Sequence, residues 1–385
     1  MKPYLKLYFL CGALFLSACG TDDDTTGIAP INSTIVGVAV GTTSDYTTAS
    51  HSLIATELPY NAHTELAPDD NTDIDISQYG NFFYKINRGG DSIIKFDVAN
   101  SEEPIWECST GADSNPYQLI QISDSKAYVL RYGAGEVWVV NPSIDSSSKC
   151  ATSFKTGEID LSSFDTIDNI PNMAQGVVVG DYMFVIMQRL TPKWSPEGPG
   201  LIAVIDITTD TLVDADDTIS GTQAITLVGK NPQSIQFFNN KLYVQSVGEY
   251  YSSVYEGGID TIDPTDFTVT QLVDDTLNTT KQISGMVIIS NTVGYLISYE
   301  GWKVNTLYQF NPTTGDIEMD GGTSPAPIAS LSSQNISGIY AGPNNSLWVG
   351  GDSGFTILDT SDNSVIQTLI DTKMNPTGLV FIDRS

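Results

Sequence analysis

The sequence is poor in the residues that build most catalytic centres. Its 385 residues include two histidines, His51 and His63, both in the N-terminal part. The chain therefore has few histidines from which a zinc site or a Ser-His-Asp triad could be built. The sequence also has no Cys-x-x-Cys-His haem motif and no phosphate-binding P-loop. We therefore predict no catalytic residues, and the sequence identifies no cofactor.

Basic residues are also scarce. The chain has 17 Lys and Arg against 46 Asp and Glu, which gives a formal net charge of −29. This charge disfavours nucleic acid as a partner and direct attraction to an anionic membrane surface. We expect an acidic protein from an outside or salty environment, with a load of divalent cations as the alternative. The acidic run 69–75 lacks the glycine and the distal glutamate of a calcium loop, so we predict no metal site.

No apolar run reaches the length of a transmembrane helix. The apolar stretch from Leu7 to Leu16 follows Lys2 and Lys6, and it is too short to span a bilayer but typical of an export signal. It ends in Leu16-Ser17-Ala18-Cys19, which resembles a bacterial lipobox. The resemblance implies a signal peptide over 1–18 and a lipid such as palmitate on Cys19. An ordinary signal peptide is the alternative.

A short acidic segment follows Cys19. Gly20 fits delivery to the outer membrane, and Asp22-Asp23-Asp24 resembles the surface-export signal of Bacteroidetes lipoproteins. A flexible acidic tether over 19–33 is the alternative explanation for the triplet. We expect an outer-membrane lipoprotein on the periplasmic or cell-surface face, held to the membrane by its lipid.

A β-rich phrase that ends in Asp or Asn occurs six times. Its terminal residues are 44, 65, 57, 48 and 48 positions apart. A period of this length with several short strands per unit is typical of a β-propeller. We expect the terminal side chains to form Asx-turns rather than a catalytic set. They are Asp97, Asn141, Asp206, Asp263, Asn311 and Asp359.

The two ends of the chain complete the ring. After the marker Asn375-Pro376 only one strand remains, whereas the β-rich runs Ile35 to Val40 and Ser52 to Glu57 precede the first full unit. Joining these segments closes the ring and removes exposed sheet edges. The sequence therefore predicts an all-β, seven-bladed propeller over 34–385 whose last blade combines N- and C-terminal strands.

Two cysteines remain in the expected mature chain, Cys108 and Cys150. An exported protein meets oxidising conditions, so we expect them to form a disulfide. Each follows the end of a repeated strand, which places both on outer strands of neighbouring blades, with a strand over Cys150 to Phe154. The role is structural, because a redox pair would usually be a close Cys-x-x-Cys.

The repeat resembles the YVTN/YncE-like seven-bladed propellers. The resemblance depends on the Asn-Pro markers, an aromatic-Val pair, and Asn-Arg-Gly-Gly-Asp-Ser-Ile at 87–93 before a hydrophobic-Asp turn. It covers about residues 34–383 and implies the fold, which hosts many activities. With the lipobox and the acidic tether, the chain also looks like Bacteroidetes surface propellers that deliver cobalamin to a TonB-dependent transporter, although no ligand motif is matched.

Charged residues follow the second strand of each unit. Three of the four arginines lie there in consecutive units, and acids occupy the same place in the next three. These loops are expected on one face, which would then have a basic and an acidic half. Arginine suits carboxylate, phosphate or amide oxygens, whereas local ion pairing is the alternative. The positions are Arg88, Arg131, Arg189, Glu249, Glu300 and Asp352.

Aromatic residues mark the loops of the same face. The long loops 191–199 and 249–256 carry Trp194 and Tyr250, and a shorter loop carries Trp302. Aromatics on loops held by a rigid scaffold are typical of binding surfaces. The alternative is that Trp194 and Trp302 fold back over their own blades.

Three functions fit these observations. The first is a monomeric, non-enzymatic capture protein that binds a small-molecule ligand or a TonB-dependent transporter. The second is a protein-interaction or adhesion scaffold that uses the aromatic loops. The third is a lactonase-like or quinone-dependent enzyme, which the shortage of histidine disfavours.

Overall fold

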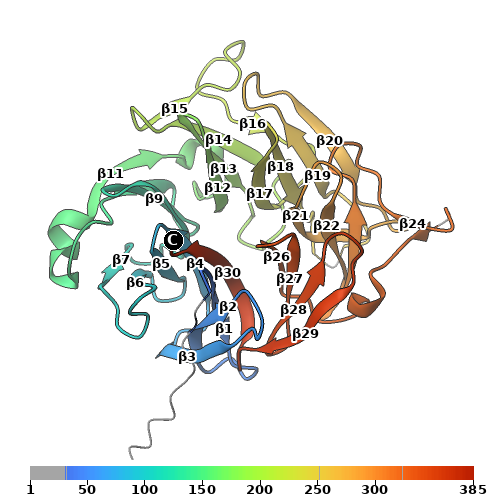
Figure 1. Cartoon of the computed structure of the whole chain (residues 1–385). Coiled ribbons are helices and arrows are strands. Elements are labelled where there is room, and N and C mark those ends of the chain that lie inside the picture. Colours follow the sequence, from blue (N-terminus) through green and yellow to red (C-terminus); the bar gives the residue numbers. More distant parts are fainter. Residues whose placement is uncertain (1–30, 32, 251, 323) are drawn as a thin grey trace, which may run out of the picture. The chain divides into compact units, whose positions relative to one another are not determined.

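Seven antiparallel sheets follow one another around a ring (Figure 1). The computed structural model describes residues 31, 33–250, 252–322 and 324–385. This arrangement confirms the predicted all-β, seven-bladed propeller. The predicted signal peptide, Cys19 and the tether up to residue 30 lie outside the described residues. Within the described residues, no helix combines the length and apolar character needed to cross a bilayer.

One blade joins the two ends of the chain, as predicted. From the centre outward it contains β30 (Asn375–Asp383), β1 (Ile35–Thr42), β2 (Ala49–Ala55) and β3 (Ala62–Asp69). Val38 on β1 lies opposite Val380 on β30 and Leu53 on β2. This pairing closes the ring: β1 from one end of the chain lies between β30 from the other end and β2, so its backbone is paired on both sides.

The other six blades follow in chain order, and their strands run from the centre outward. The second and third contain β4 (Ile74–Tyr79), β5 (Phe82–Asn87), β6 (Ser92–Asp97), β7 (Trp106–Ser109), then β8 (Pro116–Ser123), β9 (Lys126–Arg131), β10 (Glu136–Val140) and β11 (Lys155–Asp160). The fourth and fifth contain β12 (Met173–Val179), β13 (Tyr182–Met187), β14 (Leu201–Asp206), β15 (Thr211–Val213), with β16 (Ile225–Thr226) beside β14, then β17 (Pro232–Phe238), β18 (Lys241–Ser246), β19 (Gly258–Ile262) and β20 (Val269–Asp274).

The sixth blade has three main strands and a small separate hairpin. It contains β21 (Gln282–Ile288), β22 (Gly294–Gly301) and β23 (Val304–Phe310), with the hairpin β24 (Met319–Asp320) and β25 (Ser324–Pro325). The seventh contains β26 (Gly338–Gly342), β27 (Ser346–Gly351), β28 (Gly354–Asp359) and β29 (Val365–Asp371). Short helical segments are η1 (Ser147–Lys149), η2 (Cys150–Phe154), η3 (Ser162–Phe164) and η4 (Ala329–Leu331).

Glutamine side chains connect neighbouring blades at the centre of the ring. Gln118 on β8 accepts the backbone N–H of Gly176 on β12 at 2.8 Å, and Gln175 on β12 accepts that of Ile235 on β17 at 2.7 Å. Gln236 on β17 repeats the contact with β21. Each bond satisfies a backbone donor that faces away from its own sheet. The blades are therefore joined by directional bonds as well as by apolar packing.

The six repeated Asp and Asn residues are turn formers. Each accepts the backbone N–H of the residue two positions later, at 2.8 to 3.0 Å. These are the predicted Asx-turns. Because the side chains are occupied in this way at the outer turns of the blades, they do not form a common catalytic set.

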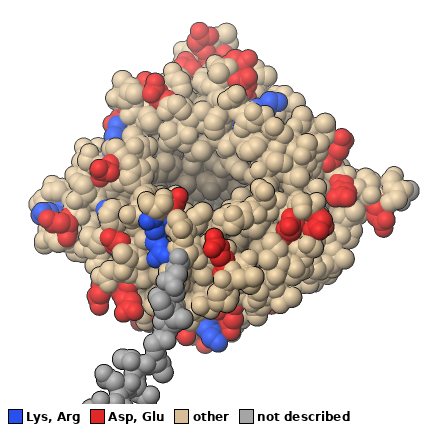
Figure 2. Space-filling model, in the orientation of Figure 1, with Lys and Arg blue, Asp and Glu red and all other residues tan. Residues whose placement is uncertain are grey.

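Acidic side chains dominate the charged surface. On the face drawn in Figure 2, Asp and Glu are spread around the periphery and far outnumber Lys and Arg, whereas the central hollow is walled mainly by uncharged residues. This distribution follows from the net charge of −29. A surface of this kind repels polyanions.

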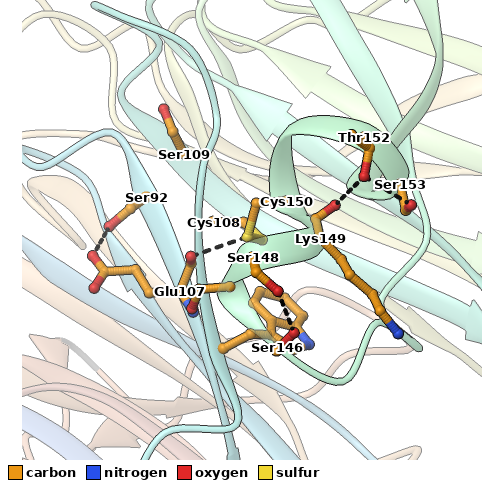
Figure 3. Close-up of a disulfide and its surroundings, with 12 residues drawn as sticks. Ser92, Glu107, Cys108, Ser109, Ser146, Ser148, Lys149, Cys150, Thr152 and Ser153 are labelled. Carbon is orange, nitrogen blue, oxygen red and sulfur yellow. Dashed lines mark hydrogen bonds between the residues drawn. A yellow bond between two sulfur atoms is a disulfide. The ribbon is translucent and has the colours of Figure 1, made fainter.

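Cys108 and Cys150 are joined by a disulfide between the second and third blades, with Cα atoms 5.4 Å apart (Figure 3). Cys108 lies on the outer strand β7, but Cys150 begins the helical segment η2. The prediction of a strand over Cys150 to Phe154 is therefore wrong, since the outer strand starts at Lys155. The helical turn lets buried Phe154 pack on Trp106, with ring centroids 5.3 Å apart.

Candidate functional site

The loops after the second strands and the segments before the innermost strands share one face of the propeller. On this face a cavity of 710 Å³ opens between loops of the first, fourth, fifth, sixth and seventh blades. Its wall is rich in aromatic side chains, and polar uncharged groups lie between them. The aromatic residues are Tyr46, Trp194, Tyr250, Tyr299 and Trp302.

The two tryptophans of this cavity stand in solvent. Trp194 and Trp302 are each 69% exposed, so neither folds back over its own blade. Tyr250 lies edge-on to Tyr299, with ring centroids 5.8 Å apart. Large exposed aromatic groups that line a cavity are characteristic of a binding surface. The structure thus brings together three of the predicted site residues, Trp194, Tyr250 and Trp302.

Hydrogen bonds hold the loop that carries Trp194 in a tight turn. The Thr191 N–H donates to the Ser195 carbonyl at 2.9 Å, and the Trp194 N–H donates to the Thr191 carbonyl at 2.8 Å. The Ser195 hydroxyl then donates to the Glu249 carboxylate at 2.6 Å. Glu249, a further predicted residue, therefore lines the cavity and braces two long loops against each other.

Two buried carboxylates accept hydrogen bonds from the backbone where the neighbouring loops begin and end. Asp260 accepts the backbone N–H groups of Val228 and Gly229, both at 3.0 Å, and Asp275 accepts that of Gly257 at 2.9 Å. Burial raises the pKa of Asp260, and it raises the pKa of Asp275 to about 6. These acids act as structural acceptors beneath the loop that carries Tyr250.

A second cavity, of 450 Å³, lies on the same face between the second, third and fourth blades. Trp194 lines it as well as the larger cavity. Its other walls are strongly polar and contain carboxylates, one amide pair and one guanidinium. These polar residues are Asp73, Asp91, Asp113, Asp168, Asn115, Asn172 and Arg88.

Arg88 is the predicted arginine that lines this second cavity. Its guanidinium donates to Asp75 at 2.6 Å and stacks on Tyr117, 4.1 Å from the ring centroid. Tyr117 is in turn stacked on Tyr132 with centroids 4.2 Å apart. Burial raises the pKa of Asp75, and the nearby Arg88 opposes this effect. The stack and the bond to Asp75 fix the guanidinium in the wall of the second cavity.

The other two arginines are engaged in local ion pairs. Arg131 lies 3.0 Å from Glu136 and stacks on Trp138, whereas Arg189 lies 2.7 Å from Glu197. Neither residue lines either of the two cavities. The structure therefore does not gather the three arginines into a basic half, and the alternative of local pairing describes their contacts.

The remaining predicted acids lie beside the larger cavity. Glu300 pairs with Lys281 at 3.1 Å, and Asp352 accepts a hydrogen bond from Asn335 at 2.7 Å while it lines a smaller third cavity. The larger cavity instead displays Lys193 and Lys303. Among the described residues that line or border these cavities, acidic and basic side chains are interspersed, since aspartates surround Arg88 and lysines stand near the acidic positions.

Sequence reasoning missed part of the larger cavity. Tyr46 comes from the turn between β1 and β2, and Lys303 lies 5.8 Å above its ring. Tyr46 lies in the blade that joins the two ends of the chain, and none of the six repeated phrases occurs in this blade. The repeat therefore does not mark its loops. Among residues 31, 33–250, 252–322 and 324–385, no group of three or more His, Cys, Asp or Glu could hold a metal ion.

Comparisons with known proteins support the fold. No family model and no curated protein matches the chain. Among solved structures, a candidate 6-phosphogluconolactonase from Bacteroides fragilis is 13% identical, with a TM-score of 0.62, over 91% of this chain and 98% of that one. Kuenenia stuttgartiensis hydrazine synthase is 16% identical (TM-score 0.54; 86% and 95% covered), and Citrobacter koseri AztD is 13% identical (TM-score 0.50; 90% and 98% covered). At these identities the likeness concerns the fold alone.

Proposed function

We propose that this chain is a non-enzymatic binding protein whose site is the 710 Å³ cavity. The observation that carries the proposal is the pair of tryptophans that line it, each 69% exposed on braced loops. Exposing an indole ring to water has an unfavourable free energy, and a ligand that covers the ring removes this apolar surface from water. The cavity lies within the range of roughly 300–1,000 Å³ that suits small-molecule ligands.

The binding test uses calorimetric titration of the protein with corrinoids, siderophores and neutral oligosaccharides. We expect Trp302→Ala to weaken binding of the responding compound at least about tenfold, because a central aromatic anchor carries a large share of binding energy. Tyr182→Ala is the matched control, since Tyr182 is an exposed aromatic at the other end of β13 from the loop. Equal affinities of the two variants would place the site elsewhere.

The proposal includes export and a lipid anchor at Cys19. Its support is the lipobox-like sequence, and we expect palmitate labelling of the chain that Cys19→Ala abolishes. Cys11→Ala is the control because Cys11 lies within the expected signal peptide, and it should keep the label. Protease treatment of intact cells then distinguishes the cell-surface face from the periplasmic face. Labelling that persists in Cys19→Ala would contradict the anchor.

The proposed partner is a TonB-dependent transporter that receives the captured ligand. The support is the likeness to surface propellers noted in the sequence, together with a loop face that offers exposed aromatics. Co-purification from detergent-solubilised outer membranes tests this partner. Recovery of the chain without any transporter, combined with no small-molecule binding, would favour the adhesion scaffold instead.

A further inference from the structure

The two cavities of the loop face meet at a single side chain. Trp194 lines both, and its turn contributes Lys193 and Ser195 to the larger cavity and Thr191 and Pro192 to the smaller. The turn is held by its own backbone bonds and by the contact with Glu249. Trp194 is therefore a fixed partition over which one ligand can extend from one cavity to the other.

The larger cavity suits a ligand that has flat apolar faces and polar edges. Its indole and phenol rings offer flat surfaces, while hydroxyl and amide groups lie between them. Such a wall can pack against C–H groups and donate or accept hydrogen bonds around the rim of the same ligand unit. The polar uncharged residues of this wall include Thr42, Ser284, Asn305, Asn335, Ser337 and Asn375.

The smaller cavity suits a ligand with many hydroxyl groups. Its exposed carboxylates can accept hydrogen bonds from hydroxyls, and charge-assisted bonds of this kind are strong. Asp73 keeps 59% of its side chain exposed although one of its oxygens lies 3.5 Å from the Arg88 guanidinium, and Asp113 is also exposed. Asp91, by contrast, is occupied by the Asn115 and Asp113 N–H groups, both at 2.8 Å. Four aspartates against one arginine also disfavour a polyanion in this cavity.

We infer that the ligand is a neutral oligosaccharide that runs across Trp194, with sugar rings stacked on the aromatics of the larger cavity and hydroxyls bonded to the acids of the smaller. Pyranose rings combine apolar C–H faces with hydroxyl edges, which matches both linings. Each cavity can take a ligand unit on its own, since both volumes lie within the range of roughly 300–1,000 Å³ found for small-molecule pockets. This inference rests on the proposed binding function and names its ligand class.

The test compares chain length and charge by calorimetric titration. The probes are cellohexaose, xylohexaose, mannohexaose and maltohexaose, the corresponding disaccharides, and hexameric galacturonate as the anionic counterpart. We expect at least one neutral hexasaccharide to bind about tenfold or more tightly than its disaccharide and than the galacturonate hexamer. Binding that does not depend on length, or stronger binding of the anionic oligomer, would overturn the inference.

Three variants then test how each of the two cavities contributes to binding. Trp194→Ala should weaken the hexasaccharide much more than the disaccharide and so remove the length advantage, because only the longer ligand crosses Trp194 into the smaller cavity, whereas Trp302→Ala should weaken both to a similar degree. Tyr182→Ala, the exposed aromatic control, should change neither, and unchanged thermal midpoints show that all three variants fold. A Trp194→Ala variant that keeps the length advantage would overturn the shared site.

The outcome separates this inference from the proposal beneath it. A corrinoid or siderophore that binds and depends on Trp302, with no response to any oligosaccharide, refutes the ligand class and leaves the binding function intact. No response to any compound in either panel refutes both.

Discussion

Replacing Cys108 and Cys150 together with alanine is expected to lower the unfolding free energy by about 4 kcal/mol. The bridge joins residues 42 positions apart, so in the chain-entropy description it removes many conformations from the unfolded chain. It also ties β7 of the second blade to η2, next to the outer strand of the third. Urea unfolding of the oxidised protein and of the double variant measures the difference.

Reduction provides the matched control for this variant. A reductant should shift the urea midpoint of the original protein toward that of the double variant and leave the double variant unchanged. Buried Cys108 contributes packing as well as the bond, since it is 1% exposed. If the oxidised protein and the double variant had the same urea midpoint, the disulfide would not contribute to the unfolding free energy.

Acidification from pH 6.5 toward about pH 3 is expected to destabilise the protein through His51, by up to about 5 kcal/mol. His51 is fully buried in the N-terminal blade, where Nε2 lies 2.7 Å from the Ser101 carbonyl and the ring meets Phe83 and Phe96 edge-on. Burial, and secondarily the nearby Lys85, lowers the pKa of His51 from 6.5 to about 3, although the bond to Ser101 opposes this shift. The contribution is thus fully present above pH 6.5.

The direction of the change in stability with pH follows from the protons that the folded and unfolded chains bind. Below pH 6.5 the unfolded chain binds a proton at His51 that the folded protein does not bind until about pH 3, so stability falls across that interval. Asp275 acts in the opposite direction: burial raises its pKa to about 6, so its contribution is present below the ordinary pKa of 3.8 and is lost as pH rises through 6. The contribution of His51 is therefore obtained from the difference in unfolding free energy between variants at each pH, not from the pH dependence of the original protein alone.

The measurement is urea unfolding of the original protein and of His51→Gln at several pH values between 4 and 8. The glutamine cannot titrate, so the variant should be less stable at neutral pH but show a smaller fall on acidification. His63→Gln, which removes the other histidine, is the matched control and leaves the His51 contribution in place. A fall of equal size in His51→Gln and His63→Gln would assign acid sensitivity to other groups.

The architecture could be predicted because its signals are local and repeated. Each Asx-turn needs only one side chain and the backbone two residues later, so six of them were found from spacing alone. The composite blade followed from an unpaired strand at the C-terminus. The helical segment η2 was missed because its path depends on Phe154 reaching Trp106, a contact between two blades.

The candidate site could be predicted only in part. The aromatic residues on two long loops and one shorter loop could be recognised, and three of them line the cavity. The comparable positions of the three arginines after the second strands favour a common site, with local ion pairing as the alternative, but side chains at comparable positions need not point in the same direction. All three arginines meet an acid on their own blade, and Arg88 in addition stacks on Tyr117 of the next blade.

The sequence by itself determined the inner strands, the repeated turns, the number of blades and the closure of the ring, because each depends on residues close together in the chain or on a regular period. Tertiary structure alone decided which loops meet, and therefore that Tyr46, Trp194 and Trp302 line one cavity and that Trp194 also borders a second. The physical reason is that the ring sets distances between loops of different blades, whereas sequence separation carries no information about those distances.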